Sequence, residues 1–244
     1  MDGHDLLELL FPRLDAAHRL ELRVLDRRRL ARRAFCEDID QALRIAAGDA
    51  GTGNVLFGVA ARGGGDDGTR RNLAYTAALW ADVDTDRYPD RAAALGAIRR
   101  TEPLASAVVD SGHGYHAYWL LDAPRPLADG REVDRVEGAM RGLRARLRLP
   151  GGPALDPCHD ASRLLRLPGT LNHKSSPPLP VAVVELHAGR RYRLDDLAGL
   201  YVPAAAATRA VAFDGEERDA GEALARCVAG GPHAASFTRA GSVT

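Results

Sequence analysis

The sequence has no apolar run close to the roughly 20 residues that a membrane-spanning helix needs. It also lacks the basic and then apolar start of a signal peptide, because its first residues include Asp2, Asp5 and Glu8. We therefore expect a cytoplasmic protein that makes no contact with a membrane.

Cysteine is scarce as well, with three residues, Cys36, Cys158 and Cys227, that lie far apart and form no CxxC pair. Such spacing argues against a disulfide framework and against a structural zinc site. A hydrophobic content of 45 % and a charged content of 27 % in 244 residues are ordinary for a globular protein of one large domain or two small ones.

Net charge is absent too, because 33 basic residues balance 33 acidic ones. This balance disfavours strong non-specific binding to duplex nucleic acid, although it leaves room for a local basic groove. Lysine is nearly missing, since Lys174 stands alone in a chain whose other basic residues are arginines. A lone lysine against that background is a hint that its identity matters.

What the sequence does contain is a strand that ends in two carboxylates. The apolar positions of residues 79–84 (LWADVD) predict a buried strand, in which alternate side chains point to one face. Asp82 and Asp84 therefore leave the sheet side by side, an arrangement that suits a divalent cation. A solvated acidic turn is the alternative, since Asp86 and Asp90 follow closely.

The order of the predicted elements gives this strand a context. We expect helices at residues 4–18, 38–48, 89–100 and 130–148, and strands at residues 20–25, 54–61, 77–84, 105–110, 114–121 and 180–187. From residue 77 the order is β-α-β-β-α-β, the split βαβ arrangement of ferredoxin-like and RNA-recognition-motif-like (RRM-like) folds. This order predicts an α+β fold with helices on one face of an open sheet. The elements before residue 60 would form an N-terminal α/β lobe with a short strand and helix at residues 188–202.

Three stretches stand outside this frame. A basic run at residues 27–33 is more typical of a solvated helix face than of a nucleic-acid contact. The glycine-rich residues 62–71 lack the GK[ST] signature of a P-loop and suggest a linker, although their arginines leave a phosphate contact open. The Ala, Gly and Arg content of residues 203–244 predicts a loosely ordered tail or linker, with a short helix at residues 216–228. The folded domain would then comprise residues 1–202.

A second motif lies at the turn between two predicted strands, in residues 109–119 (VDSGHGYHAYW). Strand periodicity and hairpin pairing would bring His116 close to the face that carries Asp82 and Asp84. The turn also offers a hydroxyl and a close backbone approach that suit a phosphate oxygen, through Ser111, Gly112 and Gly114. A plain hairpin with a structural histidine is the alternative.

A third motif combines an acidic residue with a group of cations. Four potential anion-binding side chains follow one another closely: Arg163, Arg166, His173 and Lys174. Asp156 precedes them, and Asp160 competes with it as the acidic member. We favour Asp156 because it ends a short apolar segment, as a residue carried by a strand would. A carboxylate beside cations resembles a site for a metal-bound, triphosphate-bearing ligand.

The three motifs, in this order, resemble those of the archaeo-eukaryotic primase (AEP) superfamily, and most closely its RepB-type primase and primase-polymerase branch of plasmids and phages. In that superfamily a hydrophobic strand ends in DxD or DxE, an SGxGxH-type motif follows, and a third acidic residue precedes an Arg/Lys-rich strand. The counterparts here are residues 82–84, residues 111–116, and Asp156 with residues 163–170. The PGTxNxK ending of the branch matches residues 168–174, and the likeness spans residues 54–187.

This resemblance implies a two-lobed primase fold and a DNA-directed nucleotidyltransferase. Asp82, Asp84 and Asp156 would hold two Mg²⁺ or Mn²⁺ ions, which activate a primer 3′-hydroxyl and stabilise the leaving pyrophosphate. The nucleotide-binding groups would be Ser111, Gly112, Gly114, His116, Arg163, Arg166, His173 and Lys174. The implied partners are a single-stranded DNA template, nucleoside triphosphates, and a replicative helicase as a separate chain or a lost C-terminal domain.

Two other functions remain open. A catalytically inactive relative of the same fold would bind nucleic acid without transferring nucleotides. An HUH-type replication-initiator endonuclease shares an RRM-like sheet, but it needs two histidines around one hydrophobic residue and a nucleophilic tyrosine on a helix. Here two residues separate His113 from His116, and no tyrosine lies on an evident helix after them.

Overall fold

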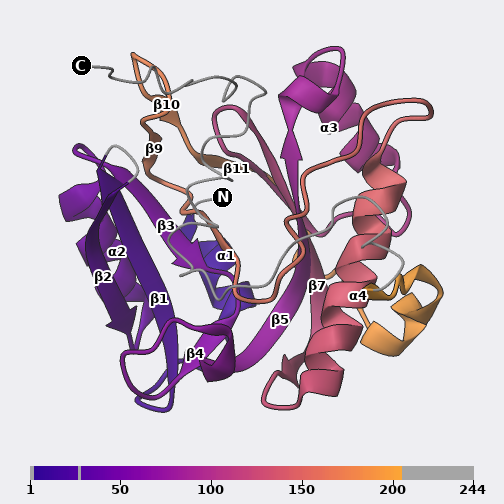
Figure 1. The fold of residues 1–244 in the computed structure, drawn as a ribbon. Helices are drawn as coiled ribbons and strands as arrows, with labels where there is room; N and C mark the ends of the chain where they lie inside the picture. Colours follow the sequence, from indigo (N-terminus) through magenta and orange to yellow (C-terminus); the bar gives the residue numbers. More distant parts are fainter. Residues whose placement is uncertain (1–2, 27–28, 205–244) are drawn as a thin grey trace, which may run out of the picture.

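The computed structural model describes residues 3–26 and 29–204. Figure 1 shows its elements, which are in chain order α1 (Gly3–Leu10), β1 (His18–Asp26), β2 (Arg29–Cys36), α2 (Ile39–Asp49), β3 (Asn54–Gly58), β4 (Ala61–Gly63), η1 (Arg70–Asn72), β5 (Leu73–Asp84), η2 (Thr85–Arg87), α3 (Arg91–Arg100), β6 (Ala107–Asp110), β7 (Gly114–Pro126), α4 (Gly130–Leu147), β8 (Leu164–Arg166), β9 (Leu171–Asn172), β10 (Leu179–Pro180), β11 (Ala182–Leu186), β12 (Arg191–Tyr192) and η3 (Leu194–Leu200). The tail predicted at residues 203–244 and its short helix lie, apart from the first two residues, outside the described part of the chain.

One large sheet organises the molecule. Its strands lie in the order β11-β6-β7-β5-β4-β1-β3-β8, with β2 added at β1 and β12 at β7. The start of β1 pairs with β4, whereas residues 22–25 of the same strand pair with β3. β1 therefore joins an N-terminal half around β1 to a C-terminal half around β5 and β7, on the left and right of Figure 1.

The C-terminal half confirms the predicted mixture of helices and strands, and most of its sheet is antiparallel. β5, α3 and β6 form a split βαβ unit, because β7 lies between β5 and β6 and runs antiparallel to both. The last strand, β11, pairs with β6. A ferredoxin-like fold would place it beside β5, but β4 already occupies that edge of β5. The complete RRM-like strand order is therefore not found.

The N-terminal half departs from the sequence prediction in three places. α1 ends at Leu10 and not at residue 18, because Pro12 has no N–H with which to continue the helix. The basic run contributes to the edge strand β2, whose residues 29–33 are all exposed. Residues 188–202 do not join this half, since β12 pairs with β7 and η3 packs on α4. The later strand that does join it is β8, through β3.

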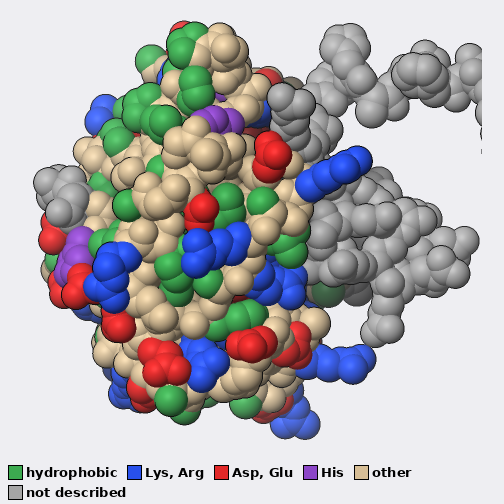
Figure 2. All heavy atoms as spheres, turned by 90° about the vertical axis from the view of Figure 1, so that its left-hand side faces the viewer, with side chains coloured by type: hydrophobic (Ala, Val, Ile, Leu, Met, Phe, Trp, Pro, Cys, Tyr) green, Lys and Arg blue, Asp and Glu red, His purple; other side chains and the backbone are tan. Residues whose placement is uncertain are grey.

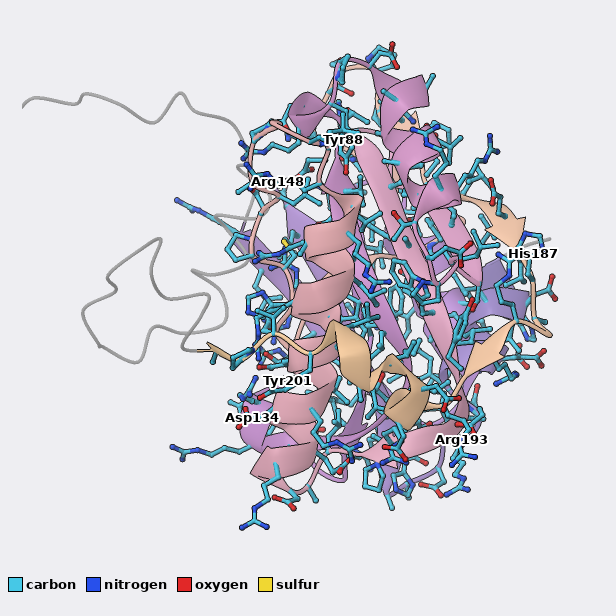
Figure 3. All side chains as sticks on the ribbon, turned by 90° about the vertical axis from the view of Figure 1, so that its right-hand side faces the viewer. Tyr88, Asp134, Arg148, His187, Arg193 and Tyr201 are labelled. Carbon is cyan, nitrogen blue, oxygen red and sulfur yellow. The ribbon has the colours of Figure 1, made fainter. Side chains whose placement is uncertain are left out.

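The C-terminal half has its core around β5 and β7, where Leu79, Trp80, Tyr118 and Trp119 are fully buried. α4 packs on β5, and η3 covers α4 in turn with three buried leucines, Leu194, Leu197 and Leu200. Figure 3 shows Tyr201 beside α4, just after η3. The next residue is also fixed there, because the N–H of Val202 donates to the carbonyl oxygen of Gly138 at 3.1 Å.

The face that carries β2 and α2 shows basic and acidic side chains intermixed (Figure 2). Arg32 of β2 lies 3.1 Å from Asp49, and Arg19 of β1 lies 3.0 Å from Glu37. This mixture gives no support to a nucleic-acid contact through the basic run. Within residues 3–26 and 29–204, no helix combines the length and the apolar character that crossing a membrane requires.

Candidate active site

The centre of the site is the end of β5, where it pairs with the start of β7. Asp82 lies directly opposite His116 in the ladder, and Asp84 lies opposite Gly114. Because side chains alternate along a strand, both carboxylates and the imidazole share one face. His116 Nε2 is 3.9 Å from Asp82 Oδ1. The structure thus brings together the two motifs that the sequence predicted to meet.

Asp84 is the most perturbed carboxylate of the site. Burial raises the pKa of Asp84 to about 7, and the nearby charges of Asp82, Asp156 and Asp86 add to this effect, whereas Lys174 opposes it. Like charges that crowd one another in a partly buried place favour either a proton or a metal cation. The electrostatics therefore suit a divalent cation at the end of β5.

Asp156 is less simply placed than the sequence suggested. It lies in an irregular segment before β8 and not on a strand, so that part of the prediction is wrong. Its Oδ1 accepts a 2.7 Å hydrogen bond from Arg87 Nη2. Asp156 nevertheless acts on the pKa of Asp84, whereas the rival candidate Asp160 does not figure among the charges that do so.

The side chains at the end of β5 offer ligands of the kind that a divalent metal ion requires. Asp82 and Asp84 supply carboxylate oxygens from one strand face, the kind of ligand that Mg²⁺ and Mn²⁺ prefer. In the described ranges, however, no three side chains of His, Cys, Asp or Glu stand close enough together to form a metal site as they are. The residues fit a metal ion in chemistry, and Asp156, whose Oδ1 is held by Arg87, would complete the set.

His116 is 1 % exposed, and burial is the main reason that its pKa falls to about 4. Arg166 and Arg163 lower this pKa further, while Asp82 opposes them. The imidazole is therefore neutral near pH 7, and its buried Nδ1 has no hydrogen-bond partner. A neutral ring can donate or accept a hydrogen bond, but it supplies no positive charge.

Two arginines face these acidic groups. Arg163 is 7 % exposed, and its Nη2 lies 3.7 Å from Asp82 Oδ2 and also contacts the sulfur of Cys158. Arg166, on β8, has Nε and Nη2 buried without a hydrogen-bond partner, and burial lowers its pKa against the opposing charges of Asp82 and Asp84. Unpartnered guanidinium donors beside carboxylates are suited to an anion that arrives with a cation.

The turn that carries Arg163 is fixed from both halves of the sheet. The N–H of Ala161 donates to Glu137 Oε1 of α4 at 2.9 Å, and Arg62 Nη2 of β4 donates to the carbonyl oxygen of Ser162 at 3.0 Å. Arg62 is itself fully buried, with Nε 2.9 Å from Glu21 Oε2. Because Arg62 is engaged in this way, it is not available as a phosphate contact at the end of residues 62–71.

The hairpin at residues 111–114 uses its glycines for backbone geometry. Gly112 has φ +91°, a conformation that L side chains rarely adopt. A Cβ on Gly114 would lie 2.5 Å from the carbonyl oxygen of Val83 on β5. The carbonyl oxygen of Ser111 is also engaged, because it accepts a 2.6 Å hydrogen bond from Asn172 Nδ2. The predicted phosphate contact of this turn stays a prediction.

The two predicted cations at residues 173 and 174 have different surroundings. His173 turns toward the N-terminal half, where its Nε2 lies 2.9 Å from the carbonyl oxygen of Ala50. Its ring is therefore not brought to the carboxylates. Lys174 is exposed, and its charge acts on both Asp84 and His113. Lys174 thus lies at the open edge of the site.

Sequence reasoning missed two residues of this arrangement. His113 has a buried Nε2 without a hydrogen-bond partner, and burial lowers its pKa, followed by the charges of Lys174 and Arg166. Its position inside the glycine-rich turn was the available signal. The second is Arg87, the partner of Asp156, and no local pattern links two residues so far apart in the chain.

The fold that carries this site is similar to those of solved primase domains. No family model matches the sequence, and no curated protein matches it. Among solved structures, the AEP domain of the cyanophage S-2L primase-polymerase (PrimPol) is 15 % identical, with a TM-score of 0.54 over 77 % of this chain and 90 % of that one. The catalytic domain of primase RepB′, solved in complex with initiator DNA, is 13 % identical, with a TM-score of 0.50 over 82 % of this chain and 93 % of that one. The chain therefore has the fold of the archaeo-eukaryotic primase domains, of the kind found in RepB-type primases and primase-polymerases.

Proposed function

We propose that the chain is a primase or primase-polymerase that carries out template-directed nucleotidyl transfer from a nucleoside triphosphate to a 3′-hydroxyl in plasmid or phage DNA replication. The observation that carries this proposal is the cross-strand pair of Asp82 and His116, with Asp84 beside it on the same face of a primase-type sheet. Two carboxylates on one face supply the oxygen ligands that metal-assisted nucleotidyl transfer uses.

Asp82, Asp84 and Asp156 are the residues that would hold two Mg²⁺ or Mn²⁺ ions. When bound, such ions lower the pKa of the attacking hydroxyl and neutralise charge on the leaving pyrophosphate. The remaining groups of the chain bind and orient the nucleotide. Neutral His116 offers a hydrogen bond from a water-excluded position, while Arg166 and Lys174 offer positive charge to the phosphates.

A single-stranded DNA template is the partner that this function requires. The catalytic domain of RepB′ was solved with initiator DNA, which supports the same class of partner for this chain. The helicase expected to work with a replicative primase would be a separate chain or a further domain.

The test is a synthesis assay with purified protein, a single-stranded template and Mn²⁺, in which ribonucleotides and deoxynucleotides are supplied separately. Asp84→Ala and His116→Ala are expected to lower product formation by about 100-fold or more, because each removes a group at the reacting end of β5. Asp134→Ala is the matched control, since Asp134 is exposed on α4. Wild-type synthesis by both site variants, with folding verified by circular dichroism, would show that the assignment is wrong.

A catalytically inactive nucleic-acid-binding relative is the second candidate. It is favoured by one observation, that Arg87 and Arg163 already lie against two of the three carboxylates. A Mn²⁺ titration separates the two functions. The enzyme is expected to bind two ions per chain and to lose affinity in Asp82→Ala, whereas the inactive relative would do neither.

The HUH-type endonuclease is the weakest candidate. His113 lies in the turn and His116 on β7, so the two histidines do not share a strand face. No helix in the part of the chain that the structure describes contains a tyrosine, which that reaction needs as its nucleophile.

A further inference from the structure

Arg87 has a place in the site that the proposed reaction does not explain. It ends η2, three residues after Asp84, and its Nη2 donates to Asp156 Oδ1 at 2.7 Å. Its Nε lies 3.5 Å from Asp86 Oδ1. Arg87 and Asp156 are 28 % and 24 % exposed, so water screens their pairing only in part. A protein cation therefore holds one oxygen of the carboxylate that would complete the metal site.

Two of the three carboxylates of the site lie close to an arginine. Asp82 lies within ion-pair distance of Arg163, and Asp156 within that of Arg87. Asp84 has no such partner among the described residues, and nearby carboxylates oppose its ionisation. The guanidinium groups of Arg163 and Arg87 thus partly neutralise the negative charge that a divalent cation would otherwise neutralise.

A divalent cation and Arg87 cannot both use Asp156 fully. If the cation takes the carboxylate, the guanidinium loses its partner and remains close to a second positive charge, which is unfavourable. An incoming triphosphate relieves this, because a guanidinium fork matches phosphate oxygens as well as it matches a carboxylate. Since Arg87 follows the acidic strand end directly, it stays close to where the phosphates must lie.

We propose that Arg87 exchanges between Asp156 and the phosphate groups of the incoming nucleotide, so that the divalent cation and the nucleotide bind cooperatively. The exchange rests on the proposed function, because it takes Asp156 as a metal ligand. Without nucleotide, Arg87 competes with the cation and keeps its affinity low. With nucleotide, Arg87 is drawn to the phosphates and the competition ends. By linkage, the cation must strengthen nucleotide binding by the same factor.

The experiment measures Mn²⁺ binding to the full chain by electron paramagnetic resonance of the free ion, with and without a non-hydrolysable deoxynucleoside triphosphate analogue. Arg87→Gln is expected to bind Mn²⁺ about two- to fivefold more tightly than the wild type when nucleotide is absent, as removal of a partly exposed ion-pair competitor implies. The analogue should strengthen Mn²⁺ binding in the wild type and have clearly less effect in Arg87→Gln.

Two further measurements test whether the effect on Mn²⁺ affinity is specific to the pair of Arg87 and Asp156. Arg99→Gln is the matched control, because Arg99 of α3 pairs with Glu185 at 2.6 Å away from the acidic cluster, so it should leave Mn²⁺ affinity unchanged. In an Asp156→Asn background, Arg87→Gln should have no effect on Mn²⁺ binding, because the contested carboxylate is gone. If Arg87→Gln does not fold, Arg87→Met retains the aliphatic stem and supplies the same measurement.

The exchange is overturned if Arg87→Gln binds Mn²⁺ no more tightly than the wild type, or if its effect persists in the Asp156→Asn background. Failure of the proposed function has a different signature. If the wild-type protein shows the coupling but makes no product, the exchange of Arg87 stands and the proposed polymerase function is wrong. If the protein makes product but shows no coupling, the polymerase function stands and the exchange of Arg87 is wrong.

Discussion

The ionised carboxylate of Asp84 lowers the stability of the fold, although the proposed function requires its charge. Its carboxyl has a folded-state pKa of about 7 against an ordinary 3.8, so folding hinders its ionisation. Between these two values the unfolded chain releases the proton and the folded chain keeps it. Stability therefore falls as the pH rises through this window, and the full penalty is present above pH 7. An ionised Asp84 that destabilises the metal-free protein is the form that a bound cation would use.

Asp84→Asn is accordingly expected to stabilise the metal-free protein. At pH 8 in the presence of a chelator, the free energy of unfolding should rise by about 1–2 kcal/mol, after allowance for partial exposure of the group. The gain should shrink as the pH is lowered to 5, and urea titration at both pH values measures it. Asp134→Asn, at an exposed position of α4, should show no such gain. A gain that grew toward low pH would contradict the sign of the shift.

At the scale of elements, the site depends on how closely β7 approaches β5. Gly114 begins β7 opposite Asp84, and a Cβ there would meet the carbonyl oxygen of Val83. Gly114→Ala is therefore expected to lower the free energy of unfolding by about 2–3 kcal/mol, because the strands must separate to admit the methyl group. Gly130→Ala is the control, since nothing lies within 4 Å of a Cβ on that residue of α4. Equal stability of the two variants in urea would refute this account.

The same elements show what the sequence could and could not predict. Strand periodicity put Asp82 and Asp84 on one face of β5, and the predicted β-α-β-β order, which sets the strand of His116 beside β5, put His116 on that face too. The pairing of Asp156 with Arg87 and the turn of His173 toward Ala50 depend on contacts between distant residues. No local pattern encodes those contacts.

Competition between elements explains the remaining errors of prediction. A run of basic residues is typical of a solvated helix face, which is why a helix is predicted here. An edge strand exposes such residues equally well, and β1 is the strand with which β2 pairs. β11 was expected beside β5, yet β4 takes that edge. Which strand pairs at an edge of the sheet depends on all the strands that compete for it and not on one segment alone.

For the whole molecule, the C-terminal half depends on η3 as a cover for α4. Three leucines of η3 are buried, and Arg141 Nε donates to the carbonyl oxygen of Val202 at 2.6 Å, so the contacts continue to residue 202. Removal of residues 194–202 would expose the apolar surface of α4 that η3 covers. The end of the folded domain can therefore be tested by shortening the chain.

A chain that ends at residue 204 is expected to fold, whereas one that ends at residue 193 should lose about 4–6 kcal/mol of unfolding free energy. The loss corresponds to the burial of Leu194, Leu197 and Leu200 at about 1.5–2 kcal/mol for each side chain. The triple variant Leu194→Ala, Leu197→Ala and Leu200→Ala in the longer chain is the matched control. It should reproduce most of the loss, because it removes the same apolar contacts without removing the backbone. Urea denaturation of the three chains measures the difference, and equal midpoints for the two lengths would mean that the domain ends before η3.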